Sequence, residues 1–443
     1  MSGRLAKLAF AMAPIPFGSV ETSWTILWIV VLAISLAFAP VSQRRGEATW
    51  IAASVVVGLI LIGLHSVVFV SPSHGYIAAD PAWALARELD ASLVDRPSST
   101  RSNPLVALGP FLLAALAFLA GYMHAQTARQ GQRILAVIAW AGLLIAIYGI
   151  ASTLLDTRLI LWREKTAYIF NVTGTFVNRN TAGTYFGSCS ILWFLMAARR
   201  LELLGPSWDR RVRIEHLLGR REMRPVYAAL AGFLVCFGAL VMTGSRGGLA
   251  ATTIGLVVVG AIYGRHVVGR IGWRWSGGVL VLFGLGLLIE LIGGTLAGRI
   301  ERDGFGDPLR LETYEATLAM IADHPLLGIG LGNFDALFPR YRPDTLLNPG
   351  VLDKAHSSWL ELLVSLGLPL GLALIALALA CGAALLRGSL ARRHYRILPL
   401  AGLGVGIVGS LHSLFDFSLQ IPGYAVVVAA IVGCGLAQRH PNA

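Results

Sequence analysis

The stretch TWIAASVVVGLILIGLHSVVFV, from Thr49 to Val70, contains no aspartate, glutamate, lysine or arginine. A helix needs about 20 predominantly apolar residues to cross the hydrocarbon core of a bilayer. The stretch therefore predicts a membrane-spanning helix. Further apolar runs of this length are Pro104–Gln126, Ile134–Leu155, Val226–Met242 and Gly277–Leu296.

The composition supports a membrane protein, since 56% of the 443 residues are hydrophobic and 14% are charged. A soluble domain could not cover that much apolar surface. We predict an all-α polytopic helix bundle with about twelve transmembrane helices. Leu5–Val20 is interpreted as a retained helix rather than a signal peptide, because no small-residue cleavage site follows it. The other shorter candidates are Trp24–Pro40, Thr181–Ala198, Gly247–Gly264, Ser357–Leu386, Ile397–Leu414 and Pro422–Leu436.

The net charge of +12 is concentrated in loops between the apolar runs, most densely in Arg199–Arg224. This distribution follows the positive-inside rule and argues against nucleic acid as a partner. Basic loops on the cytoplasmic side also leave both termini in the cytoplasm. The remaining polar segments then face outward: Ser71–Asn103, Asp156–Asn180, Thr243–Gly247, Gly298–Ala355 and Phe415–Ile421.

The sequence lacks the motifs that are typical of disulfide frameworks, metal sites and nucleotide-binding sites. The four cysteines each lie inside an apolar run, without disulfide or metal-ligand spacing. No Walker A, HExxH, Cys-x-x-Cys or Asp-x-Asp motif is present, so we expect no cofactor and no metal. GVGIVG at 404–409 is interpreted as helix packing and GIGLG at 328–332 as a turn. The apolar spacing before that turn predicts a helix in the long outer loop.

Arginines are unusually frequent in the predicted outer segments. A guanidinium group suits phosphate oxygens, although each arginine could instead reach lipid head groups or pair with an acidic side chain. Arg246, in TGSRGGLAA, favours a functional site because charges near the membrane are costly and its glycines admit a ligand. The outer arginines are Arg163, Arg179, Arg246, Arg299, Arg302, Arg310, Arg340 and Arg342.

His356, in DKAHSSWLELL, lies where a polar segment meets an apolar run. A neutral imidazole there could accept a proton from a hydroxyl, since its ordinary pKa is about 6.5. Alternatively, it could cap the start of a helix. Glu361 is not expected to orient His356, because five helical residues at about 100° each place it about 140° away.

Several motifs occur in the order seen in one family. They are GTFVNRNTAGTYF (174–186), TGSRGGLAAT (243–252), RLETYEATLAMIADHPLLGIGLGNF (310–334), AHSSWLELLVSLGLPLGL (355–372) and HSLFDFSLQIPGY (412–424). In this order the chain resembles the O-antigen ligase and polymerase superfamily of bacterial envelope proteins. The resemblance covers the C-terminal two-thirds, so we divide the chain into N-terminal transmembrane helices, 1–155, and a catalytic region, 156–443, with periplasmic loop 298–355.

The resemblance implies a glycosyltransferase of the bacterial inner membrane with its active site facing the periplasm. Such enzymes take a glycan from undecaprenyl diphosphate and join it to an acceptor hydroxyl. His356 matches the family histidine that activates the acceptor, and Arg246 and Arg310 match arginines that hold the diphosphate. Arg179 is our own addition to the diphosphate site. Supporting residues are expected at Asn178, Asn180, Arg340, Arg342 and Asp416.

The acceptor stays open at the level of sequence. A ligase uses lipid A-core, a polymerase a growing glycan, and a third type a protein. The short AHSSWLELL motif and the modest loop carry no added acceptor domain, which favours a ligase. We expect metal-independent, inverting transfer, with membrane lipids as further partners. A lipid-linked glycan transporter is the rival class, but its paired half-repeats are not found.

Overall fold

The computed structural model describes residues 1–40, 46–73, 78–100, 103–156, 158–204, 221–265, 308–343, 353–391 and 396–439. Within these ranges the regular structure is nearly all helical. The exception is a short antiparallel hairpin of β1 (Leu159–Ile160) and β2 (Arg163–Glu164). The predicted all-α polytopic fold is confirmed.

Six of the described helices are long and apolar enough to cross a membrane. They are α3 (Glu47–Val70), α5 (Asn103–His124), α6 (Ala128–Leu155), α9 (Arg224–Met242), α10 (Arg246–Gly264) and α15 (Ser358–Ala391). Three shorter apolar helices accompany them: α2 (Thr22–Ala37), α16 (Ile397–His412) and α17 (Pro422–Ala437). The predicted span Gly277–Leu296 and most of the basic loop Arg199–Arg224 lie outside the described residues.

The expected span Leu5–Val20 is wrong. Its helix, α1 (Ser2–Met12), has 11 residues and reaches only about half the hydrocarbon thickness at roughly 1.5 Å per residue. After it the chain turns through Pro14 and Pro16, whose rings cannot continue a helix, into the short helix η1 (Phe17–Ser19). The hydroxyl of Thr175 donates to the Pro14 carbonyl at 2.7 Å and so satisfies it.

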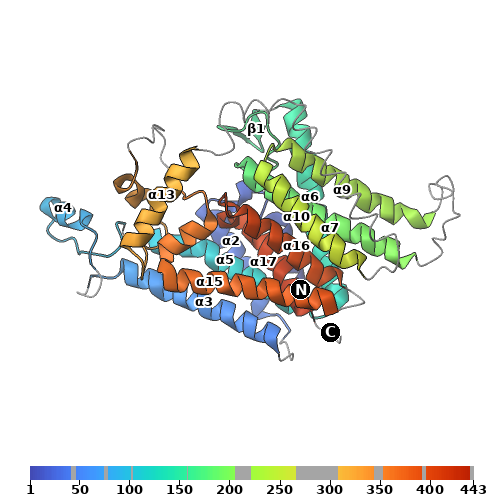
Figure 1. Ribbon diagram of the computed structural model, residues 1–443, viewed down its shortest axis with the longest axis horizontal. Helices are drawn as coiled ribbons and strands as arrows, with labels where there is room; N and C mark the ends of the chain where they lie inside the picture. Colours follow the sequence, from blue (N-terminus) through green and yellow to red (C-terminus); the bar gives the residue numbers. More distant parts are fainter. Residues whose placement is uncertain are drawn as a thin grey trace.

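Helix α7 (Arg179–Leu203) is buried over most of its length and packs against α6, α9, α10 and α16 (Figure 1). Small side chains allow these close approaches. A Cβ added at Gly187 would overlap Thr252, and one added at Gly183 would lie 2.9 Å from the Cβ of Ser245. The helix therefore holds the start of α10 close to its own start.

The described loops on the predicted outer side meet at one end of the bundle, here called the loop end. Backbone hydrogen bonds join Ser98 to Phe69, and Val172 to Met242, across this end. The opposite end, here called the terminal end, holds the start of α1 and the end of α17, where Gln438 donates to the Ala125 carbonyl. Figure 1 shows α4 (Ala82–Leu89), α13 (Pro308–Asp323) and β1 away from both marked termini.

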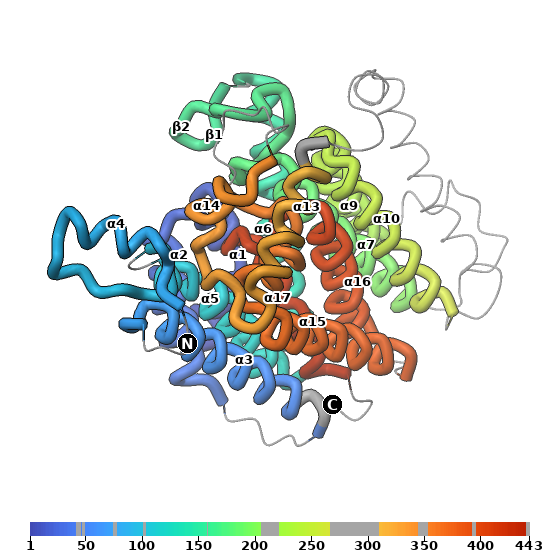
Figure 2. The backbone as a smooth tube through the Cα atoms, turned by 60° about the vertical axis from the view of Figure 1, so that its left-hand side comes forward, coloured from blue at the N-terminus to red at the C-terminus, as the bar shows by residue number. Residues whose placement is uncertain are grey.

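The long loop forms a small unit on the start of α15 (Figure 2). It holds the expected helix, α13, followed by α14 (Phe334–Leu337) and η3 (Phe338–Arg340). Its apolar core includes Met320, Phe334, Phe338, Ala355 and Val364. This separate core seats the loop on the segment that precedes α15.

Helix α15 is broken at Gly367, which has φ 75° and ψ 166°, two residues before Pro369. The break leaves the carbonyls of Val364 and Ser365 without helical partners. They accept from the backbone N–H groups of Ile329 at 2.9 Å and Gly330 at 3.0 Å. GIGLG at 328–332 is thus a turn, as expected, and it completes the hydrogen bonding of the broken helix.

Candidate active site

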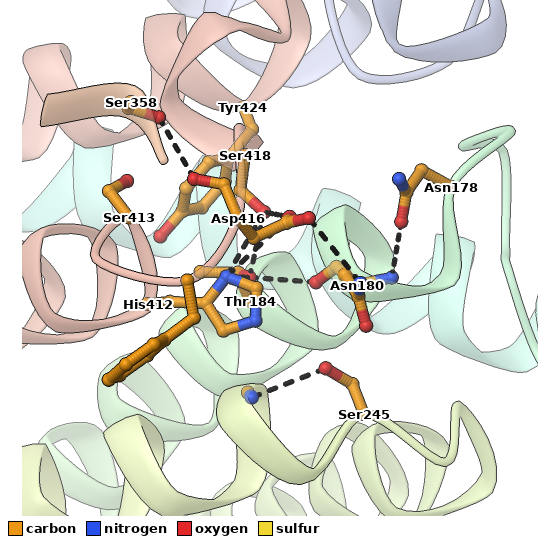
Figure 3. A network of polar contacts seen from close by, with 12 residues as sticks. Asn178, Asn180, Thr184, Ser245, Ser358, His412, Ser413, Asp416, Ser418 and Tyr424 are labelled. Atoms are coloured by element: carbon orange, nitrogen blue, oxygen red, sulfur yellow. Dashed lines mark hydrogen bonds and ion pairs between the residues drawn. The ribbon is translucent and has the colours of Figure 1, made fainter. Parts of the chain in front are cut away.

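Asp416 lies at the centre of a buried polar network at the loop end (Figure 3). Its carboxylate accepts from the Ser418 hydroxyl at 2.6 Å and from the Asn180 amide at 3.4 Å. Its backbone carbonyl accepts from the N–H and the hydroxyl of Ser358, each at 3.1 Å. Asp416 is 1% exposed. This expected supporting residue therefore joins α7 to the start of α15 from inside the protein.

His412 is the second buried member of the network and was not expected from the sequence. Its Nδ1 lies 3.0 Å from the Thr184 hydroxyl, 3.2 Å from the Ser418 hydroxyl and 3.7 Å from the Asp416 carboxylate. On the opposite edge, a Cβ at Gly247 would lie 3.2 Å from Nε2. His412 thus packs between the starts of α7 and α10.

The starts of α7 and α10 point into the loop end with their first turns capped. Asn178 accepts from the Asn180 N–H at 2.7 Å, and Ser245 accepts from the Gly248 N–H at 3.2 Å. Arg179 and Arg246 are the first residues of these helices. A helix N-terminus favours an anion, and an arginine there adds a full positive charge.

The outer arginines differ in the contacts that they make in the structure. Arg246 is exposed and makes no ion pair or hydrogen bond with the residues the structure describes. The Arg310 guanidinium donates to the Phe415 carbonyl at 3.0 Å, in the turn that carries Asp416. Arg179 lies over the Tyr168 ring at 5.1 Å. These three arginines occupy the side of the loop end that surrounds the His412–Ser418 turn.

Two other outer arginines are paired away from this turn. Arg340 binds Asp80 through two hydrogen bonds of 2.8 and 3.2 Å, and Arg163 pairs with Glu21 at 2.6 Å. Arg340, expected as a supporting residue, therefore fastens the loop to the segment before α4. Arg342 is half-buried in the same loop, and Arg299 and Arg302 lie outside the described residues.

His356 is half-buried, two residues before α15, with an unusual φ of 53°. Its ring lies 5.5 Å from the Phe417 ring, and its carbonyl accepts from the Tyr314 hydroxyl at 3.1 Å. Both neighbours, Ala355 and Ser357, are buried. The Ser357 hydroxyl accepts from the Leu360 N–H at 3.4 Å, so Ser357 supplies a cap at the start of α15.

Glu361 contacts the backbone of the segment that carries His356, a role that the sequence analysis did not foresee. Its carboxylate accepts from the Ala355 N–H at 3.0 Å and from the Gln420 amide at 3.1 Å, with the Lys354 ammonium at 3.7 Å. The expectation assumed one continuous helix from His356 to Glu361. Instead the chain folds back before Ser358, so the carboxylate reaches the backbone next to His356.

Other residues expected to have only packing roles do so. All four cysteines are free and buried. A Cβ at Gly404 would lie 2.7 Å from Val259 and 2.9 Å from Ile191, as expected for close helix packing. Among the described residues, no group of three or more His, Cys, Asp or Glu side chains is arranged to hold a metal ion.

Residues 231–375 match a family model described as O-antigen ligase. The matched segment runs from α9 to the first half of α15, and it contains Arg246, Arg310 and His356. A search of curated proteins found no match to this chain. The segment and the apolar helices identify an integral membrane protein of the glycosyl-transfer type. Over residues 231–375, about a third of the chain, the match supports the resemblance to the O-antigen ligase and polymerase superfamily.

Proposed function

We propose that this chain transfers a glycan from undecaprenyl diphosphate to an acceptor hydroxyl at the periplasmic face of the inner membrane. One observation carries the proposal: the turn from His412 to Ser418 contacts the segments that bear the proposed base and the three proposed diphosphate-binding arginines. The Phe415 carbonyl accepts from Arg310, and the Asp416 carboxylate accepts from Asn180. The Phe417 ring lies 5.5 Å from the His356 ring and is tilted by 57° to it. His412 packs on Gly247, next to Arg246.

In the proposed reaction His356 accepts the proton of the acceptor hydroxyl. The acceptor oxygen attacks the anomeric carbon, and the bond from that carbon to the diphosphate oxygen breaks. The electron pair of the broken bond stays on the diphosphate. Because attack and departure occur on opposite faces, the anomeric configuration inverts. A positioned general base typically contributes about 10²–10⁴-fold to such a step.

Arg246, Arg310 and Arg179 hold the diphosphate in this proposal. Negative charge grows on the leaving group as the bond breaks, and fixed guanidinium groups stabilise it without reorganising. The starts of α7 and α10 add their partial positive charge. This arrangement supports transfer without a metal ion.

The direct test uses purified protein in micelles with an undecaprenyl diphosphate-linked glycan and an acceptor, with and without EDTA. We expect a new glycosidic bond and released undecaprenyl diphosphate in both conditions. Loss of activity with EDTA, restored by a divalent cation, would overturn the metal-independent step. Movement of the lipid-linked glycan between leaflets without a new bond would instead establish a transporter.

For the acceptor we propose lipid A-core, with a growing glycan chain as the alternative. The support is the modest size of the loop unit, which holds α13, α14 and η3 within its described residues. A deletion strain distinguishes the two. Accumulation of lipid-linked polymer with bare core indicates a ligase, whereas single repeats on the core indicate a polymerase.

The proposed orientation places the loop end in the periplasm and both termini in the cytoplasm. Asp335 is exposed in the loop unit, and the four native cysteines are buried, so Asp335→Cys provides a selective label site. An impermeant thiol reagent should label it in cells whose inner membrane is intact. Labelling only after that membrane is breached would reverse the topology.

A further inference from the structure

A cavity of about 250 Å³ opens at the terminal end, between the start of α1, the end of α5 and the start of α6. Arg4, Lys7, His124, Gln130 and Arg133 line it. Helix α6 runs from this cavity to the loop end, so its 28 residues separate the cavity from the candidate active site by roughly 40 Å. The glycosyl-transfer chemistry does not use this cavity.

The cavity concentrates positive charge that no carboxylate balances. Its lining contains Arg4, Lys7 and Arg133 but no aspartate or glutamate. Within the described ranges, none of these three side chains has an ion-pair or hydrogen-bond partner. Cations gathered without a counter-charge favour an anionic ligand.

Another basic site at the terminal end shows that the chain can neutralise its own arginines. Glu202 pairs with Arg199 at 3.3 Å and with Arg396 at 3.4 Å, and it accepts from the Tyr263 hydroxyl at 2.5 Å. The cavity has no corresponding internal carboxylate among its lining residues. Among the described residues, no carboxylate lines the cavity, so an external anion can supply the counter-charge.

The cavity wall is held by a polar chain that crosses three helices. The Ser35 hydroxyl donates to the Ser2 carbonyl at 2.9 Å and lies 2.9 Å from Nε2 of His124. A Cβ at Gly3 would lie 3.5 Å from Nδ1 of the same ring. These contacts fix the start of α1 against α2 and α5, so the cations do not depend on a ligand for their placement.

An apolar stripe leads away from the cavity along α1. Arg4, Leu8 and Met12 follow one another at four-residue spacing, which puts them on one helix face. Leu8 is 50% exposed and Met12 39% exposed. A ligand with an anionic head and an apolar tail would contact both the basic cavity and the apolar side chains of Leu8 and Met12. A free anion would contact only the basic cavity.

We propose that this cavity binds the phosphate-bearing head group of an anionic membrane lipid, with an acyl chain along Leu8 and Met12. A volume of about 250 Å³ suits a head group better than a whole ligand, since pockets for drug-sized molecules hold roughly 300–1,000 Å³. Basic pockets between membrane helices are suited to such head groups. The proposal is independent of the acceptor and donor of the glycosyl transfer.

The test is native mass spectrometry of delipidated, purified full-length protein titrated with phosphatidylglycerol or phosphatidylcholine. The variant R4Q/K7Q/R133Q removes the three charges. The control is Arg129→Gln, an exposed α6 arginine that does not line the cavity. We expect wild type and control to prefer phosphatidylglycerol, and the triple variant to lose roughly fivefold in affinity for each charge removed.

Three outcomes would overturn the proposal. The first is unchanged phosphatidylglycerol affinity in the triple variant, and the second is equal binding of both lipids by wild type. The third is full displacement of the lipid by inorganic phosphate at millimolar concentration, which would establish a free-anion site. If the triple variant does not fold, the single variant Arg133→Gln serves, with an expected loss of roughly fivefold.

Discussion

His356 and His412 both contact residues of the turn that holds Asp416, but their surroundings differ. His356 is half-buried, on a backbone with positive φ, and contacts an aromatic ring. His412 is 3% exposed and lies within hydrogen-bond distance of two hydroxyl groups. The difference suggests a division of labour. In the proposed function His356 meets the acceptor, whereas His412 packs between the helices that carry Arg179 and Arg246.

The largest expected effect comes from His356→Ala. Activity should fall about 10²-fold or more, the usual consequence of removing a general base, with little change in thermal stability. Initial rates of glycan transfer and a melting curve of the same sample provide the measurement. Since a protonated imidazole cannot accept a proton, wild-type activity should also decrease at acidic pH.

His356→Asn is the matched variant, because asparagine can cap a helix but cannot act as a base at neutral pH. An active His356→Asn enzyme with an unchanged pH profile would make His356 structural. The division between the two histidines would then fail. His324, which is exposed directly after α13, would be the next base to test.

Arg246→Ala should give the next largest effect. Loss of a charge-assisted contact to the diphosphate costs about 1.5–3 kcal/mol in transition-state binding, or roughly 10–150-fold in kcat/KM. Arg246→Lys should restore only part of this, because it lacks the planar two-pronged donor. Arg340→Ala is the control, since Arg340 is already bound to Asp80. Full activity of Arg246→Ala at normal protein levels would remove it from the site.

His412→Ala tests the other side of the comparison. It removes a buried imidazole between Thr184 and Ser418, which should lower the free energy of unfolding by about 1–3 kcal/mol. Activity per folded molecule should fall much less than in His356→Ala. Chemical denaturation and transfer rates on the same preparations separate the two quantities. An equal loss of activity without destabilisation would give His412 a direct part in the reaction.

Glu361→Gln should have the smallest effect on activity. It tests whether the Glu361 carboxylate positions the segment that carries His356. The side-chain oxygen of glutamine can still accept from the Ala355 N–H, so only the attraction to Lys354 is lost. We expect a loss of a few-fold in kcat, of the order of 0.5–1 kcal/mol. Glu361→Ala should cost more because the buried Ala355 N–H loses its partner. Equal rates for both variants would show that the carboxylate does not position His356.

The helical architecture was predictable because span length and apolar composition are local properties of the chain. Pro14 and Pro16 interrupt the apolar run 5–20, so the sequence alone left open whether it forms a full span, and α1 ends at Met12. His412 was missed because it ends an apolar run and its partner Thr184 is 228 residues away. The pairing of Arg340 could not be predicted, because its partner Asp80 is 260 residues away in the chain. The role of Glu361 was hidden by the reversal of the chain before Ser358.

The break in α15 restricts where segments of this protein can be exchanged with those of a homologue. A Cβ at Gly328 would overlap the Val364 carbonyl, and one at Gly367 would overlap the Leu326 carbonyl, so each glycine admits the backbone of the other segment. Residues 325–330 and 364–369 therefore have to fit each other, although they are separate in the chain. A chimaera between homologues should keep both segments from the same parent, and its crossover points belong outside the pair.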